Sequence, residues 1–282
     1  MSSYNAPPAY QSKTYGTNDS AAADPLLGRA GPSNGIYNQP NPGDLPDDFK
    51  LVELASNTHV QYGVNVTESA PEIRNAFVRK VYTILFCQIL LTTIVGGYMS
   101  RNFEAVFWVQ THSWSLFVGL GATLVNLGLL FWKRHSHPIN LVLLTTFTLL
   151  EASTIGVCVA FVNNQIILQA LLITLGVFLG LTLFTIQSKW DFSGMGPFLF
   201  AGLIALLMTG LVGMFIPFGK TMDLIYAVLG TLLFSGYVVY DTFQICNRLS
   251  PDEYIMGAIS LYLDFINLFL MILRVLNNTQ SD

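Results

Sequence analysis

Residues 254–276, YIMGAISLYLDFINLFLMILRVL, are long and apolar enough to cross a bilayer, because about 20 apolar residues span the hydrocarbon core. This stretch carries one acid in its middle, Asp264, and the preceding apolar stretch, LFSGYVVYDTFQI (233–245), carries another, Asp241. A carboxylate at the centre of a membrane helix is unfavourable by about 2.5 to 3.5 kcal/mol. Chains tolerate such a group where it faces a protein interior or a water-filled path, so both acids are candidate functional residues.

The composition of the whole chain favours a membrane protein. Of its 282 residues 52% are hydrophobic and only 11% are charged, with a mean hydropathy of +0.52, whereas soluble domains have about 25% charged residues. Between residues 138 and 188 the only Asp, Glu, Lys or Arg is Glu151. That interval is long enough for two membrane spans.

The pattern of apolar runs predicts an all-α integral membrane protein with seven transmembrane helices and a disordered N-terminal tail. Residues 1–76 are rich in Pro, Gly, Ser, Asn, Tyr and Ala and lack a helical period, which is typical of disorder. Residues 77–278 form the predicted membrane domain. Its expected spans are 81–99, 114–132, 139–159, 166–186, 198–218, 224–245 and 254–276.

The basic residues predict the orientation of these spans, because Lys and Arg concentrate in cytosolic joints. If the N-terminus is cytosolic, the inner joints hold Arg74, Arg79, Lys80, Lys133, Arg134, Lys189 and Arg248, and the outer joints hold Arg101, Lys220 and Arg274. The excess on the inner side predicts a cytosolic N-terminus and, after seven spans, a luminal C-terminus.

Three acids fall inside the predicted spans: Glu151, Asp241 and Asp264. At 1.5 Å per residue, Glu151 and Asp264 lie roughly 15 to 20 Å from the cytosolic helix ends and Asp241 roughly 9 Å. Arg134 ends the second span on the same side as Asp241, which suggests a latch that closes when Asp241 is ionised and opens when it is protonated. Interacting carboxyl groups titrate as a pair, so the sequence predicts a pH sensor.

Two other roles for these acids stay open. In the first, the acids serve only to join helices by hydrogen bonds, with Tyr237 four residues before Asp241 and Asn267 three residues after Asp264 as supporting partners. Alternatively, Asp241 and Asp264 form a calcium site, since calcium takes carboxylate oxygens and acid-lined paths favour cations. The residues alone do not choose between calcium, a proton and another cation, and no cofactor is expected.

The tail contains one recognisable interaction motif. Pro7, Pro8 and Tyr10 form a PPxY pattern, which adopts a polyproline helix and docks on the aromatic groove of WW domains. The motif predicts a WW-domain ubiquitin ligase as a partner, and simple low complexity is the alternative. Residues 51–60 are mildly apolar but too short to span a membrane, and no function is assigned to them.

Several stretches resemble one known family. They are RNAFVRKVYTILFCQILLT (74–92), FWKR (131–134), FTLLEASTIG (147–156), YVVYDTFQI (237–245) and DEYIMGAISLYLDFINLFLMILRVLN (252–277). Together they resemble the transmembrane Bax inhibitor motif family, and the Pro/Tyr-rich tail is similar to its lifeguard branch. The resemblance implies a seven-helix fold, a pH-sensitive calcium leak in endomembranes and a role in restraining stress-induced cell death. It also implies that the family's pH-sensing pair is Asp241 and Asp264 and that its latch is Arg134, whereas Thr123 stands where some bacterial relatives have an acid.

The leading hypothesis is therefore a calcium leak channel of the endoplasmic reticulum, Golgi or vacuole, gated by the aspartate pair and the arginine latch. The alternative is a membrane-embedded regulatory or scaffold protein that acts by binding partners, including cell-death regulators. An intramembrane hydrolase is not expected, because Asp241 has only the YD half of the aspartyl protease pattern and all four His lie outside the spans. No nucleic-acid partner is expected, and membrane lipid and calcium are the remaining predicted partners.

Overall fold

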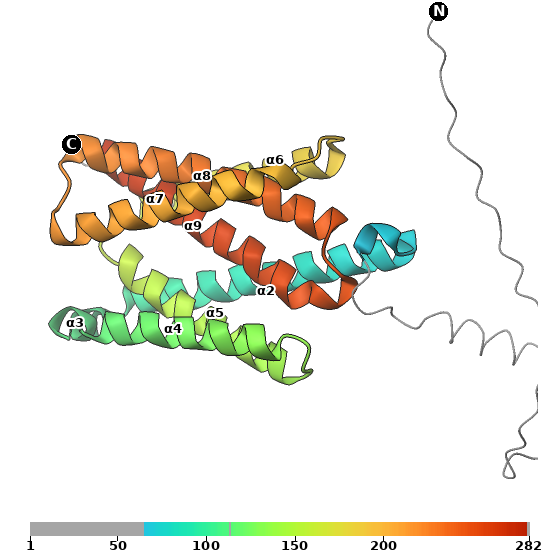
Figure 1. Ribbon diagram of the computed structural model, residues 1–282. Helices are drawn as coiled ribbons and strands as arrows, with labels where there is room; N and C mark the ends of the chain where they lie inside the picture. The colour runs from blue at the N-terminus through green and yellow to red at the C-terminus, as the bar shows by residue number, and fades with distance from the viewer. Residues whose placement is uncertain (1–64, 113, 281–282) are drawn as a thin grey trace, which may run out of the picture. The chain divides into compact units, whose positions relative to one another are not determined.

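The computed structural model describes residues 65–112 and 114–280, and all regular structure in this part of the chain is helical (Figure 1). The long helices are α2 (Pro71–Arg101), α4 (Trp114–Lys133), α5 (Ile139–Val159), α6 (Asn164–Gln187), α7 (Gly196–Phe215), α8 (Lys220–Asn247) and α9 (Tyr254–Gln280). Four shorter helices are α3 (Phe103–Thr111), η1 (Val66–Glu68), η2 (Ser193–Met195) and η3 (Pro251–Glu253). The predicted all-α fold class is confirmed.

Six of the long helices in the described residues are long and apolar enough to cross a membrane, and the apolar part of α4, Phe117–Lys133, is shorter. Together they match the seven predicted segments. The main difference is α2, which begins at Pro71, so the predicted boundary between residues 76 and 77 falls inside this helix. Hydropathy detects only the apolar part of a helix, whereas the backbone hydrogen bonds of α2 continue through its polar first turns, with Pro71 at a favourable first position.

Helix α9 is the central helix of the bundle. It packs against α2, α5, α6 and α8, and its side chains are buried along most of its length, with Leu261, Tyr262 and Leu268 fully enclosed. Helix α7, in contrast, packs on α8 and exposes most of its surface, including Phe198 at 81% and Phe215 at 77%. Large exposed apolar surfaces of this kind are covered by lipid in a membrane protein.

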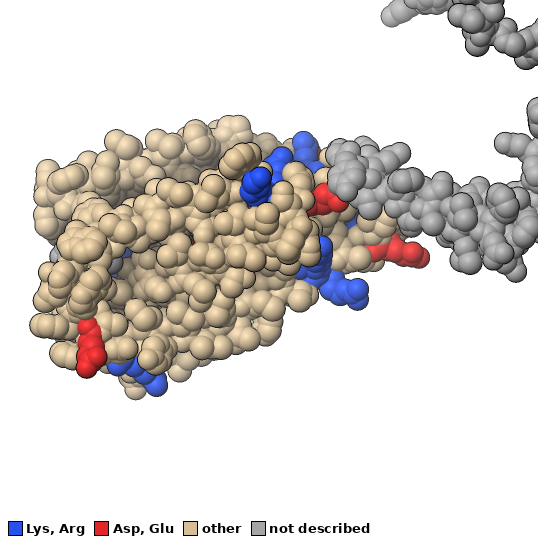
Figure 2. Space-filling view, turned by 90° about the horizontal axis from the view of Figure 1, so that it is seen from below, with Lys and Arg blue, Asp and Glu red and all other residues tan. Residues whose placement is uncertain are grey.

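The helices run alternately between two ends of the bundle (Figure 1). At one end α2 begins and the α4–α5, α6–α7 and α8–α9 joints lie; we call it the basic end, since it holds Arg74, Arg79, Lys80, Lys133, Arg134, Lys189 and Arg248. The far end holds Arg101, Lys220 and Arg274. On the face shown in Figure 2 the charged side chains lie toward the two ends, and the surface between them is uncharged.

Candidate functional site

The structure brings Asp241 of α8 and Asp264 of α9 together. Their carboxyl groups lie within hydrogen-bonding reach of each other, and Asp241 also reaches the hydroxyl group of Ser260. Asp264 is 5% exposed and Asp241 is half-buried. Ser260 and Asp264 are four residues apart on α9, which places both on one face of that helix. A hydrogen bond between two carboxyl groups requires a proton on one of them, so this contact is a site at which protonation matters.

The interior of the bundle contains buried polar atoms that lack partners. Within residues 65–112 and 114–280, the Oδ2 atom of Asp264 and the hydroxyl groups of Tyr82, Thr182 and Thr242 make no hydrogen bond. Tyr82 lies close to both threonines, so these hydroxyl groups of α2, α6 and α8 form a cluster. Unsatisfied buried polar groups are unfavourable by about 1 to 3 kcal/mol each. Such a cluster is chemically suited to hold water or a hydrated cation.

The two supporting residues predicted from the sequence behave differently. Tyr237 lies close enough to Asp241 and Asp264 to interact with both electrostatically. Asn267, in contrast, donates from Nδ2 to the carbonyl oxygen of Leu263, at 2.9 Å, and not to Asp264. The predicted Asn267–Asp264 hydrogen bond is therefore not formed, because the amide group of Asn267 bonds to the carbonyl group four residues earlier on the same helix instead.

Arg134 is paired with a residue that the sequence analysis did not consider. Its Nη1 atom lies 3.5 Å from Oε1 of Glu253, and its Nε atom donates to Nε2 of His135 at 3.0 Å. Glu253 in turn accepts from the backbone N–H of Ser250, at 3.3 Å, in the cap of η3. The predicted Arg134–Asp241 ion pair is absent from the described structure. The prediction considered only acids inside the spans, whereas Glu253 lies in the α8–α9 joint.

Glu151 does not join the aspartate pair. It is half-buried on α5, and its electrostatic neighbours are Tyr262 and Cys158. Helix α5 packs mainly on α2 and α4 and meets α9 over a small area. Similar depth in the membrane was therefore not enough to bring Glu151 to Asp264.

A buried hydrogen-bond network between α2, α5 and α9 was also missed. The hydroxyl group of Tyr262 donates to Oγ1 of Thr92 at 2.8 Å, and Thr92 donates to the carbonyl oxygen of Gln88 at 2.8 Å. Gln88 also donates from Nε2 to Thr148 at 3.1 Å, which ties α2 to α5. Gln88 and Thr92 are polar residues one turn apart in an apolar helix. This spacing was the sequence signal from which the buried network could have been predicted.

Two predictions concern a metal site and the N-terminal tail. In the part of the chain that the structure describes, no group of three or more His, Cys, Asp or Glu side chains is placed to hold a metal ion; a calcium site formed by Asp241 and Asp264 alone stays a prediction. The motif of Pro7, Pro8 and Tyr10 and the segment 51–60 lie outside the described residues.

Comparison with known proteins places this geometry in context. The family model described as "Inhibitor of apoptosis-promoting Bax1" matches residues 74–281. The chain is 43% identical to "Bax inhibitor 1" of Schizosaccharomyces pombe over 258 residues, which is 92% of this chain and 93% of that protein. It is 45% identical to "Protein lifeguard 4" of Mus musculus over 218 residues, covering 76% and 90%. It is 41% identical to the "Golgi anti-apoptotic protein" of Vaccinia virus strain Lister, with the same coverage.

Proposed function

The chain belongs to the Bax inhibitor family, and from this premise we propose that it restrains cell death and conducts calcium across an endomembrane. The cell-death role is supported by relatives named "Bax inhibitor 1" and "Golgi anti-apoptotic protein". The second name also supports an endomembrane location. The predicted resemblance to this family is confirmed.

The contact between Asp241 and Asp264 is the observation that carries the calcium proposal. Both residues belong to helices whose length and composition fit a membrane span, and Asp264 keeps one oxygen without a partner among the described residues. Buried acids attract cations and repel anions. The unpaired hydroxyl groups of Tyr82, Thr182 and Thr242 offer further oxygen ligands within the same helix bundle.

The same contact suggests how pH acts on the conduction. When the two carboxyl groups share one proton, it joins them across the α8–α9 interface; when that proton is lost, two negative charges remain and repel each other. Since α8 and α9 pack against each other more extensively than any other pair of helices in the described residues, this change of charge biases the position of one helix against the other. Protonation therefore selects between two arrangements of α8 and α9.

Liposomes provide the test. The purified full-length chain is reconstituted with a calcium dye inside, and flux is followed from pH 5 to pH 8 for wild type, Asp241→Asn and Asp264→Asn. We expect the wild-type flux to depend on pH and both variants to lose that dependence. Asp191→Asn is the matched control, because it removes an acid that is exposed in the α6–α7 joint. Wild-type flux equal to that of empty liposomes would refute conduction, and a pH response that survives both substitutions would refute the sensor.

A second candidate function is regulation through partners, with the membrane core in a structural role. It is favoured by the relatives' names, which describe opposition to cell death and mention no ion. The channel function and the partner-binding function can be distinguished in cells that express the double variant Asp241→Asn/Asp264→Asn. Protection from cell death that persists without flux supports the partner-binding function, and joint loss supports the channel.

The orientation with a cytosolic N-terminus belongs to the same proposal. It is supported by the seven Lys and Arg at the basic end against three at the far end, since short cytosolic joints are enriched in these residues. Under this orientation the Arg134–Glu253 pair faces the cytosol, and the C-terminal end of α9 faces the lumen.

A further inference from the structure

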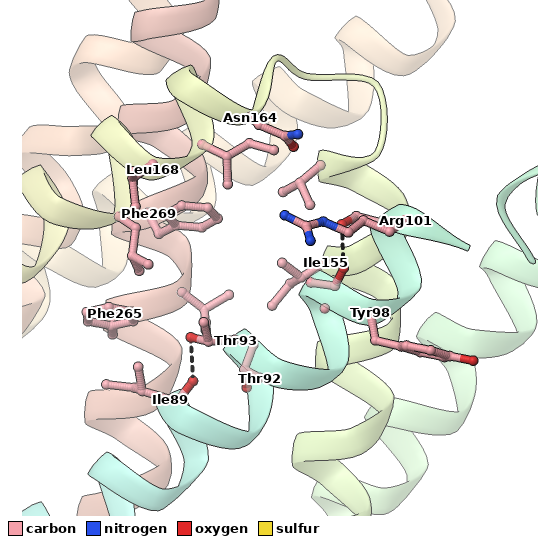
Figure 3. Close-up of a pocket in the computed structure, with 17 residues that line it drawn as sticks. Ile89, Thr92, Thr93, Tyr98, Arg101, Ile155, Asn164, Leu168, Phe265 and Phe269 are labelled. Atoms are coloured by element: carbon pink, nitrogen blue, oxygen red, sulfur yellow. Dashed lines mark hydrogen bonds between the residues drawn. The ribbon is translucent and has the colours of Figure 1, made fainter. Parts of the chain in front are cut away.

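A cavity of about 610 Å³ lies between α2, α5, α6 and α9, toward the far end of the bundle (Figure 3). It exists because α2 packs on α5 and α9, while α6 packs on α8 and α9. Helix α9 thus separates α2 from α6 and contributes Phe265 and Phe269 to the cavity wall. The remaining apolar wall includes Ile89, Leu168 and Leu171.

One positive charge points into this apolar space. The guanidinium group of Arg101, the last residue of α2, extends into the cavity, and the amide group of Asn164 lies near the same end (Figure 3). No residue of the described ranges forms a hydrogen bond or an ion pair with this guanidinium group. An arginine without a partner at the end of an apolar cavity matches a molecule with an acidic head and a hydrocarbon body.

The depth of Arg101 identifies the source of such a molecule. The helix that follows, α3, and the start of α4 carry Trp108 and Trp114, whose rings meet edge to face at 6.3 Å. Tryptophan concentrates at the level of the lipid headgroups, so Arg101 lies at the level where phospholipids carry their phosphate. A water-soluble anion would leave the apolar wall, with Phe265 and Phe269, unmatched.

We propose that the cavity is a phospholipid site, with the lipid phosphate bound by Arg101 and one acyl chain lying along Leu168, Phe265 and Phe269. The site is independent of calcium conduction, because it requires neither Asp241 nor Asp264. The proposed lipid nevertheless contacts the turn of α9 that follows Asp264.

The test is native mass spectrometry of the purified full-length protein in detergent with dioleoyl phosphatidic acid. Dioleoylglycerol, which has the same acyl chains and no phosphate, is the matched ligand. We expect phosphatidic acid to bind at least about tenfold more tightly than dioleoylglycerol, since arginine–phosphate hydrogen bonds are among the strong ones. Equal binding of the two lipids would overturn the proposal.

Two variants examine the two parts of the site. Arg101→Gln should lower the affinity for phosphatidic acid about tenfold, whereas Lys189→Gln removes a charge at the basic end and should leave the affinity unchanged. Gly97→Leu should block the acyl chain, because Gly97 lines the cavity and a Cβ atom there meets no atom within 4 Å. Binding that is the same in wild type and Arg101→Gln, or an equal loss in Lys189→Gln, would overturn phosphate recognition by Arg101. Wild-type binding in Gly97→Leu would overturn the acyl site.

Discussion

Arg134, directly after α4, and Glu253, the last residue of η3, are joined by an ion pair, with 3.5 Å between Nη1 and Oε1. The pair connects the α4–α5 joint to the α8–α9 joint at the basic end. Both side chains are partly exposed, and such pairs contribute about 0 to 1 kcal/mol. A contact of this strength is weak as a structural brace but is suited to a latch, because it opens readily.

Replacing Glu253 by Gln should therefore change gating more than stability. Opening a pair worth up to about 1 kcal/mol shifts a two-state equilibrium up to about fivefold, so we expect calcium flux in liposomes to rise by no more than this factor. The double variant Arg134→Glu/Glu253→Arg restores the pair with reversed charges and should return flux toward the wild-type value. Flux that is unchanged in Glu253→Gln would show that the pair does not act as a latch.

Tyr262→Phe should destabilise the bundle by about 1 kcal/mol. The substitution removes the 2.8 Å hydrogen bond to Thr92 in a fully enclosed part of α9, and hydrogen bonds between membrane helices contribute about 0.6 kcal/mol on average. Unfolding of the purified protein in mixed micelles measures the change. In a double-mutant cycle with Thr92→Val the two losses should not add; full additivity would mean that the two residues do not interact.

Gly156→Ala should destabilise the α2–α5 contact by about 1 to 3 kcal/mol, the usual range for overpacking. A Cβ atom at position 156 would lie 2.7 Å from Cβ of Met99 and 2.9 Å from the backbone oxygen of Gly96, and a backbone atom cannot turn aside. Gly128→Ala is the matched control, since a Cβ atom there meets nothing within 4 Å. The control should be neutral or stabilising, because Ala favours helix over Gly. Equal stabilities of the two variants would contradict this packing.

The positions of the spans and of the aspartate pair were predictable because both signals are local. Apolar runs of about 20 residues have few alternatives to a membrane helix, and an acid inside such a run requires a polar partner. Asp241 and Asp264 also lie on consecutive helices joined by a short turn, and consecutive elements are usually neighbours in space. Helix α3 was not predicted, because its nine residues are too few to span a membrane.

The partners of Arg134 and Glu151 were not predictable by the same reasoning. Depth along the membrane normal is one coordinate, and it does not say which helices are neighbours; Glu151 shares a level with Asp264 but lies on α5, which hardly meets α9. The ion-pair partner of Arg134 depends on the path of the α8–α9 joint, where the cap of η3 holds Glu253 in place.

The tail motif leads to a prediction that is independent of the membrane domain. A peptide of residues 1–20 that contains Pro7, Pro8 and Tyr10 should bind an isolated WW domain of a ubiquitin ligase, because the polyproline segment is ordered at small entropic expense before it docks. Fluorescence anisotropy measures the affinity. Tyr10→Ala should lower it at least about tenfold, since the tyrosine fills the aromatic groove, whereas Tyr4→Ala lies outside the motif and should not change it. Deleting residues 1–48 from the full chain should abolish recruitment of the ligase and leave calcium flux in liposomes intact; loss of flux in this variant would instead make the tail part of the conducting machinery.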